Sequence, residues 1–177
     1  SLSRPLRRLV NLDLLRREQP FGESPREGKR SLYKIADPFV RFWFAVVAPN
    51  RSLLSEGAPD TRLSLWRARR GSLEAQVWED LCRACVPRLH TTASPLGRLG
   101  PWGPARRYWR GDDPELDIVA SSLDGSRLLI GEAKWLSRPL DTATLRSLAA
   151  RLLSRGTAAV TAGRDVEVVY ALFVPEI

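Results

Sequence analysis

The chain has 177 residues, of which 44% are hydrophobic and 27% are charged, a composition that suits one globular domain or two small ones. It excludes collagen-like and low-complexity disordered chains, and no apolar run approaches the roughly 18–20 residues that a membrane span requires. The formal net charge is +8, and the whole excess lies in residues 1–70, with 15 basic and 7 acidic side chains. A polyanion such as nucleic acid is a natural partner of that segment, although an arginine-rich composition alone would also explain it.

The first predicted element is an amphipathic helix over residues 4–17, with leucine and valine side chains on one face and arginines on the other. Four of these arginines form a candidate DNA-binding surface, although a solvated basic face explains them equally well: Arg7, Arg8, Arg16 and Arg17. The polar residues 18–30 predict a turn or hairpin, and the residues 31–36 predict a strand.

A second helix is predicted to begin at Pro38, with Asp37 as its N-cap. Because residues 38–47 are nearly all apolar, we expect this helix to be buried on most sides. The following residues 48–60 have the composition of a linker.

A second unit is predicted to begin near Gly71, where Ser72 caps a helix over residues 73–86. The irregular residues 87–114 contain tryptophan and tyrosine among arginines, and one more strand could lie within them. Two of the arginines of this stretch are candidates for nucleic-acid contacts: Arg106 and Arg107.

The rest of the second unit reads as two strands, a helix and a last strand. Residues 115–121 and 127–135 are strand-like and flank Asp124-Gly125, a strong hairpin turn. A helix over residues 142–155, capped by Asp141 or Thr142, ends at Gly156, and the apolar residues 166–174 predict a strand in the middle of a sheet.

The chemistry of the chain centres on this predicted hairpin. Period two places Glu132 and Lys134 on one face of their strand, and the turn places Asp117 opposite Glu132. Two carboxylates about 5 Å apart repel each other unless a cation lies between them, and Mg²⁺ or Mn²⁺ would remove that conflict. Lys134 would then orient the attacking water or stabilise a phosphoryl group, and Glu74, on the helical face directed toward the sheet, would support the site. The plainer alternative is a salt bridge on an edge strand.

These residues resemble the pattern of the PD-(D/E)XK nuclease superfamily. Four segments extend the resemblance to one family, the domain at the C-terminus of archaeal and bacterial AAA-type (STAND-like) ATPases: residues 33–44, 71–74, 115–120 and 131–135. The resemblance implies an α/β (α+β) fold with a nuclease-like mixed sheet flanked by helices over residues 61–177, preceded by a partial winged-helix segment and linker helix over residues 1–60. One departure is that Pro114 stands three positions before the first acid instead of next to it.

The resemblance implies a catalytic set of Glu74, Asp117, Glu132 and Lys134, with the three acids holding Mg²⁺ or Mn²⁺. The expected function is a DNA-binding, nuclease-like effector module of a larger ATPase, with magnesium-dependent phosphodiester cleavage. The alternative is a regulatory or protein-interaction domain that keeps the fold without cutting. No ATP site is expected in this chain, because the loop from Gly22 to Arg30 departs from the phosphate-loop spacing. With two cysteines and no apolar signal segment, we expect a cytoplasmic protein.

Overall fold

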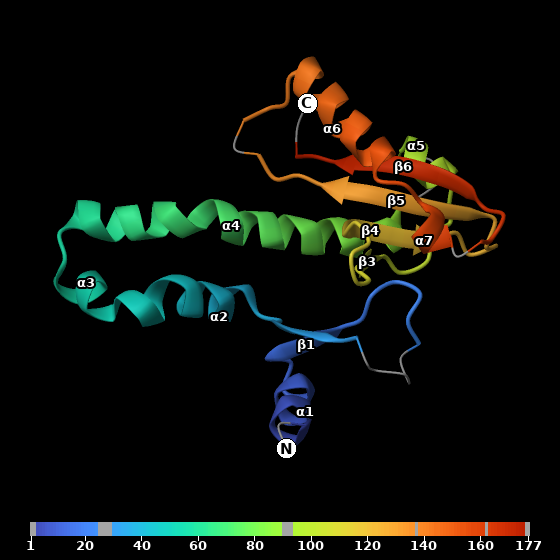
Figure 1. Cartoon of the computed structure of the whole chain (residues 1–177). Helices are drawn as coiled ribbons and strands as arrows, with labels where there is room; N and C mark the ends of the chain where they lie inside the picture. Colours follow the sequence, from blue (N-terminus) through green and yellow to red (C-terminus); the bar gives the residue numbers. More distant parts are fainter. Residues whose placement is uncertain (1–2, 25–29, 90–93, 137, 162, 176–177) are drawn as a thin grey trace. The chain divides into compact units, whose positions relative to one another are not determined.

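The computed structural model describes residues 3–24, 30–89, 94–136, 138–161 and 163–175. The chain divides into two compact units, whose elements Figure 1 labels. The N-terminal unit consists of Ser1–Glu18 and Ser31–Val77, and the C-terminal unit consists of Gln19–Arg30 and Trp78–Ile177. No helix in the described ranges combines the length and the apolar character that crossing a bilayer requires.

The N-terminal unit begins with a short helix and a hairpin. The helix α1 covers Ser3–Asn11, and the strands β1 (Leu15–Glu18) and β2 (Leu32–Ile35) pair antiparallel. The predicted helix over residues 4–17 is therefore wrong in its second half. The chain turns at Asp13, which has a φ of 55° in the left-handed region, a conformation that Asn and Asp tolerate better than most residues. The predicted strand over residues 31–36 is confirmed by β2.

The next helix begins as predicted, because the Asp37 carboxylate accepts a hydrogen bond from the Val40 amide at 2.9 Å. This helical stretch consists of three consecutive short segments: α2 (Pro38–Phe42), the π-helical η1 (Trp43–Val47) and the 3₁₀ turn η2 (Ala48–Asn50). The expectation of burial on most sides is wrong, since Phe39 and Phe44 are 66% and 61% exposed. The predicted linker contains the helix α3 (Arg51–Glu56).

A single long helix, α4, covers Pro59–Cys85. The predicted start of a new helix at Ser72 is therefore wrong, because the helix runs through Gly71 without a break. Gly71 is helical, and a Cβ added to it would meet no atom within 4 Å. Nothing in its surroundings therefore requires a glycine.

The C-terminal unit contains a four-stranded mixed sheet among its described residues, with the strand order β3-β4-β5-β6. Its elements follow η3 (Val86–Arg88) and α5 (Pro95–Arg98) and are β3 (Arg106–Tyr108), β4 (Leu116–Ser121), β5 (Arg127–Ala133), α6 (Thr142–Ser154), α7 (Ala158–Thr161) and β6 (Glu167–Phe173). The first three strands are antiparallel, and β6 runs parallel to β5. The strand suspected within the irregular segment is confirmed as β3. The prediction of a central last strand is wrong, because β6 lies at the edge.

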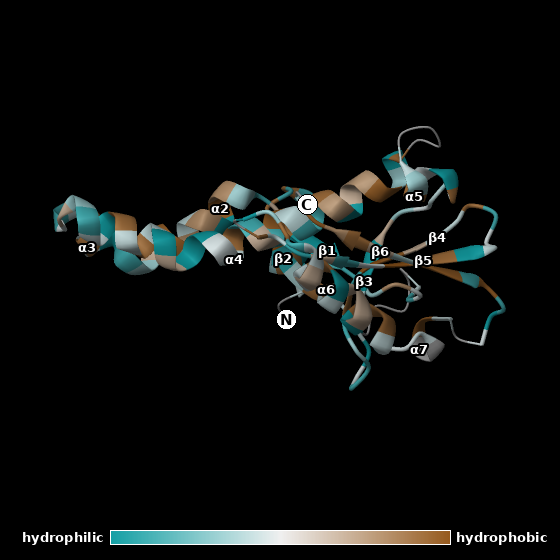
Figure 2. Ribbon diagram, turned by 90° about the horizontal axis from the view of Figure 1, so that it is seen from above, coloured by the Kyte–Doolittle hydropathy of each residue, from teal (hydrophilic) through white to brown (hydrophobic). Residues whose placement is uncertain are grey.

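Both faces of this sheet are covered, which explains why β6 is apolar although it is an edge strand. On one face, Cys82 and Val86 pack with Ile118 and Leu129. On the other face, Leu152 of α6 packs with a second cluster that also includes residues of β4 and β5. β6 contributes residues to both clusters, and Figure 2 shows the hydrophobic colouring of β4 and β5. The sheet thus lies between the end of α4 and α6, with its core on both sides.

Gly131 lies where β5 passes closest to its neighbours. A Cβ at this position would lie 2.8 Å from the Phe173 ring and 3.0 Å from Ile118 Cβ. We expect Gly131→Ala to lower the free energy of unfolding by about 1–3 kcal/mol, because the core must shift to accept the methyl group. Gly71→Ala is the matched control and should raise it by about 0.5–1 kcal/mol, since alanine favours the helix. Urea unfolding followed by tryptophan fluorescence measures both, and equal effects would contradict the packing described here.

Candidate functional site

The hairpin between β4 and β5 sets the relative positions of the predicted site residues. Gly125 has a φ of 76°, and the Asp124 carboxylate accepts hydrogen bonds from the Ser122 hydroxyl at 2.5 Å and from the Ser126 amide at 3.0 Å. These hydrogen bonds lower the pKa of Asp124 to about 2. The turn sets a register in which Ile118 lies opposite Gly131. The predicted turn and register are therefore confirmed.

Asp117 and Glu132 are the next residues beyond that pair, and the charge of Glu132 acts on Asp117. The Asp117 carboxylate accepts a hydrogen bond from the Ala133 amide at 3.1 Å, which ties β4 to the end of β5. Glu132 is almost completely buried, with 2% of its surface exposed. The end of β5 is fixed on its other side, where the Lys134 amide donates to the Phe173 carbonyl at 2.9 Å. Two acidic side chains thus lie at the same end of a rigid pair of strands.

The Glu132 carboxylate is held by cations at both oxygens. Lys134 Nζ lies 2.7 Å from Oε1. The Arg155 guanidinium forms a fork, with Nη1 2.5 Å from Oε2 and Nη2 3.1 Å from Oε1. Arg151, one helical turn earlier, lies 3.9 Å from Oε1 and is largely exposed. Such bidentate, charge-assisted contacts are among the strongest that a carboxylate makes in a protein.

Arg155 is a site residue that the sequence did not reveal. It follows α6 as its C-cap, and Nη1 also donates to the Glu115 carbonyl at 3.0 Å, so one guanidinium joins α6 to β5 and to the start of β4. From the sequence alone, a basic residue before the helix-ending Gly156 is explained by the helix dipole. Only the packing of α6 on the sheet shows that Arg155 faces a buried carboxylate.

The electrostatic environment of Asp117 differs from that of Glu132. Burial raises the pKa of Asp117 above its ordinary value of 3.8, and the nearby Glu132 charge raises it further. The hydrogen bond from the Ala133 amide and the charges of Lys134 and Arg155 oppose this rise in pKa without cancelling it. The ionised form of Asp117 is therefore destabilised in the folded protein, and perturbed pKa values of this kind are common at functional sites.

We expect Asp117→Asn to raise the free energy of unfolding at pH 7. Because the pKa is raised on folding, the folded protein binds the Asp117 proton more tightly than the unfolded chain, and its stability falls as the pH rises from 3.8 through the folded pKa. The gain should shrink below pH 3.8. Asp141→Asn is the contrasting variant: the Thr144 amide lowers the pKa of Asp141, so losing this charge should lower stability at pH 7. Urea unfolding at pH 3 and pH 7 tests both signs, and a loss of stability in Asp117→Asn at pH 7 would contradict the assignment.

Three of the four predicted site residues lie in the same unit. Asp117, Glu132 and Lys134 lie in the C-terminal unit, whereas Glu74 belongs to the N-terminal unit. The Glu74 carboxylate lies 2.7 Å from Nε of Arg70, one turn earlier on α4. The proposed support of the site by Glu74 stays a prediction.

The residues at this site do not fit the expected divalent ion in the arrangement described. Both oxygens of Glu132 already accept from cations, and the charges of Asp117 and Glu132 are balanced by Lys134 and Arg155. A divalent ion would add positive charge that nothing nearby compensates. Across the described ranges, no group of three or more His, Cys, Asp or Glu side chains is arranged to hold a metal ion. An ion would fit here only after Arg155 had left Glu132.

Some of the arginines that are predicted to contact nucleic acid are exposed, and others bind neighbouring side chains. Arg7 and Arg8 are exposed on α1. Arg16 and Arg17 lie on β1 instead of the predicted helix; Arg16 Nη2 lies 2.7 Å from the Glu18 carboxylate, and Arg17 Nε donates to the Ser31 hydroxyl at 2.9 Å. In the C-terminal unit, Arg106 is exposed on β3.

Arg107 contacts two neighbouring side chains. Its guanidinium contacts the Glu115 carboxylate and lies 5.7 Å from the centre of the Trp109 ring. Such a cation–π contact restrains both side chains. Two other aromatic residues of the same stretch are core residues: Trp102 and Tyr108 are 3% and 5% exposed.

Comparison with known proteins places the chain among uncharacterised relatives. The model of a family of archaeal and bacterial proteins of unknown function matches residues 43–147, more than half of the chain. An uncharacterized protein of Methanocaldococcus jannaschii is 26% identical over 133 residues, a match that covers 73% of this chain and 28% of that relative. The chain thus spans little more than a quarter of the length of this relative. No solved structure gives a significant match.

Proposed function

The chain belongs to DUF234, the family of archaeal and bacterial proteins of unknown function, and we propose that its C-terminal unit is a nuclease-type module that acts on nucleic acid. One observation carries the proposal. Asp117 and Glu132 directly follow the paired Ile118 and Gly131 at the end of the β4–β5 ladder, and Lys134 lies 2.7 Å from Glu132. This is the arrangement of acids and lysine that the nuclease resemblance implies.

The fold supports the proposal at a coarser level. Three antiparallel strands are followed by α6 and a parallel strand β6, and helices pack on both faces of the sheet. This order is the mixed, helix-flanked sheet expected of a nuclease-like domain. Since the chain spans 28% of a longer relative, we also propose that the module works within a larger protein, whose upstream part would be the ATPase that the resemblance implies.

The side chains supply part of the chemistry of phosphodiester hydrolysis. Asp117, with its raised pKa, accepts a proton from water more readily than an exposed aspartate does. The Lys134 side chain is 35% exposed, so its ammonium group can also reach a phosphoryl oxygen and stabilise negative charge there. In the arrangement described, Arg155 opposes both roles, because its guanidinium binds the Glu132 carboxylate, which is the neighbour of Asp117 and Lys134. We therefore propose that this arrangement is a closed state of the centre.

The two-pronged contact between Arg155 and Glu132 also favours a second candidate function. Since both oxygens of Glu132 are occupied, the domain could keep the nuclease fold and bind nucleic acid or another protein without cutting. Cleavage assays separate the two candidates.

The decisive assay uses plasmid and single-stranded DNA with Mg²⁺ or Mn²⁺ supplied. The proposal predicts more cleavage by Arg155→Ala than by wild type, and loss of that cleavage in Arg155→Ala/Lys134→Ala. Arg146→Ala is the matched control, because Arg146 is an exposed arginine on the same helix. Cleavage that does not depend on Lys134 would contradict the proposal. An absence of cleavage in every variant would favour the non-cutting alternative.

DNA binding by the N-terminal unit gives a separate prediction. Arg7 and Arg8 are exposed on α1, whereas Arg16 and Arg17 are engaged by neighbouring side chains. We expect Arg7→Ala/Arg8→Ala to weaken DNA binding and to reduce the slope of log K against log salt by about 2, roughly one per lost phosphate contact. Arg16→Ala/Arg17→Ala should change the slope less. Fluorescence anisotropy at several salt concentrations measures the slopes, and an unchanged slope in the first variant would exclude phosphate contacts by α1.

A further inference from the structure

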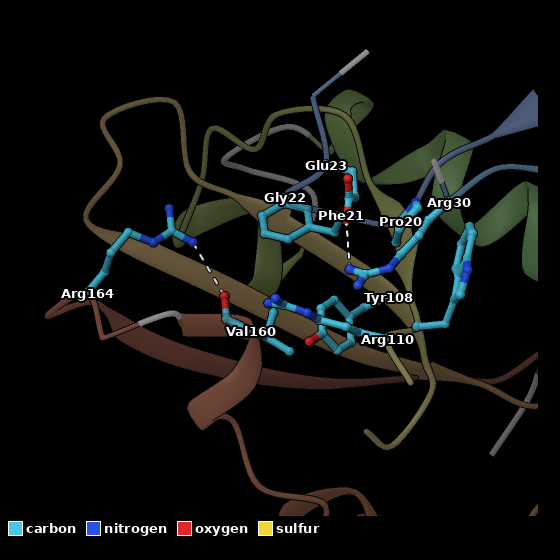
Figure 3. A pocket seen from close by; sticks show the side chains of 10 residues that line it. Pro20, Phe21, Gly22, Glu23, Arg30, Tyr108, Arg110, Val160 and Arg164 are labelled. Atoms are coloured by element: carbon cyan, nitrogen blue, oxygen red, sulfur yellow. Dashed lines mark hydrogen bonds and ion pairs between the residues drawn. The ribbon is translucent and has the colours of Figure 1, made fainter. Parts of the chain in front are cut away.

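A pocket of about 280 Å³ lies within the C-terminal unit, apart from the residues of the acidic site (Figure 3). Its walls come from the segment after β1, from β3 and the residues that follow it, and from α7 with the turn after it. Six of the lining residues decide its character, three aromatic and three cationic: Phe21, Tyr108, Trp109, Arg30, Arg110 and Arg164. The volume is close to the lower end of the range for small-molecule sites.

One backbone and one side-chain hydrogen bond hold the aromatic wall of the pocket in place. The Phe21 amide donates to the Arg107 carbonyl at 2.7 Å, which ties the segment after β1 to β3. Tyr108 is buried, and its hydroxyl donates to Asp113 at 2.8 Å. Phe21 and Trp109 are only half-buried, so parts of their rings stay accessible. Figure 3 shows Phe21 on one side of the pocket, across from Tyr108 and Arg110.

The charge of the pocket is positive. Arg30 is paired with Glu23 at 3.0 Å, which leaves Arg110 and Arg164 as cations without a carboxylate partner among the described residues. Arg164 is oriented by carbonyls, since Nε donates to Thr161 at 3.1 Å and Nη2 to Val160 at 3.5 Å. Figure 3 shows the contacts of Arg30 and Arg164 as dashed lines. The Tyr108 hydroxyl donates to Asp113 and also hydrogen-bonds with the Arg110 side chain.

Accessible aromatic rings beside two guanidinium groups that no carboxylate of the described residues pairs match a ligand that has a flat ring and an anionic group. Bases stack on aromatic side chains, and arginine binds phosphate through paired N–H donors. Inorganic phosphate would leave the rings unused, and an apolar ligand would leave the arginines unsatisfied. We propose that this pocket binds one nucleotide, with the base against Phe21 and Trp109 and the phosphate on Arg110 and Arg164.

This inference goes beyond the proposed function and does not depend on cleavage at Asp117 and Glu132. The nucleotide could be free or could be one unit of a single strand, and both present the same chemistry to the pocket. Isothermal titration of the full chain with dTMP, with a 5′-phosphorylated dT₁₂ and with inorganic phosphate distinguishes the two sources. Equal affinity per site for dTMP and dT₁₂ indicates a free nucleotide, and tighter, pocket-dependent binding of dT₁₂ indicates a strand.

Variants then assign the binding to the pocket. Arg110→Ala/Arg164→Ala should weaken dTMP binding at least about tenfold, the effect of losing one charge-assisted hydrogen bond. Arg138→Ala is the control, since it removes an exposed arginine that does not line the pocket. Trp109→Leu should weaken dTMP binding and leave phosphate binding unchanged, provided that its melting curve shows a folded protein. Equal affinities for dTMP and phosphate, equal affinities in the double variant and the control, or no saturable binding by wild type would overturn the proposal.

Discussion

Glu132→Ala should lower the free energy of unfolding by about 3 kcal/mol, near the lower end of what breaking a buried ion pair costs. The variant removes a carboxylate that is 2% exposed and leaves Arg155 and Lys134 without their shared partner. Water reduces the loss, because the side chains of Arg155 and Lys134 are 25% and 35% exposed. Urea unfolding followed by circular dichroism measures the effect.

The control for this variant is Glu167→Ala. The Glu167 carboxylate also pairs with an arginine, Arg127, at 2.7 Å, but its side chain is 61% exposed. An exposed pair of this kind contributes about 0–1 kcal/mol. If Glu132→Ala cost no more than Glu167→Ala, the buried cluster would not hold this end of the sheet together.

Arg155→Ala should lower the free energy of unfolding by about 2–3 kcal/mol, because it removes the two-pronged contact to a buried carboxylate and leaves it with Lys134 at 2.7 Å and Arg151 at 3.9 Å. The Glu115 carbonyl loses a donor in the same variant. Arg155→Lys should recover only part of the loss, since an ammonium group cannot reproduce the two-pronged contact.

Arg146→Ala serves as the control for Arg155→Ala, because it removes an exposed arginine from the same helix and should stay within about 0.5 kcal/mol of wild type. Thermal and urea unfolding of the three variants give the comparison. Full recovery by Arg155→Lys would show that charge alone, without the fork, holds Glu132.

Local signals in the sequence predicted local structure well. Asp37 and Asp141 accept hydrogen bonds from the amides three residues later, as N-caps do, and Gly156 ends α6 with a φ of 72°. The Asp124-Gly125 turn fixed the register that brings Asp117 and Glu132 together. Each of these signals depends on residues that are close in the chain, so no knowledge of the packing was required.

The wrong predictions have two causes. The helix α4 runs through Gly71 and Ser72, although both residues often end or begin helices, because strong helix formers flank them on both sides, residues 68–70 and 73–75. The apolar residues of β6 indicated burial, but burial by helices on both faces of an edge strand produces the same pattern as a central strand.

The site shows the same limit. The pairing of Asp117, Glu132 and Lys134 follows from period two and one turn, and it was predictable. The contact between Arg155 and Glu132 joins residues 23 positions apart and depends on where α6 packs, and no local pattern encodes it. We nevertheless expect this contact to decide whether the acidic pair can accept an ion.

Calorimetric titration with Mn²⁺ tests the central claim, that Arg155 takes the place of a cation at the Asp117–Glu132 pair. Wild type should show no saturable binding at millimolar Mn²⁺, whereas Arg155→Ala should bind at least about tenfold more tightly, a difference of roughly 1.4 kcal/mol. Adding Asp117→Asn to Arg155→Ala should abolish this binding. Tight binding by wild type, or equally weak binding by wild type and Arg155→Ala, would contradict the claim.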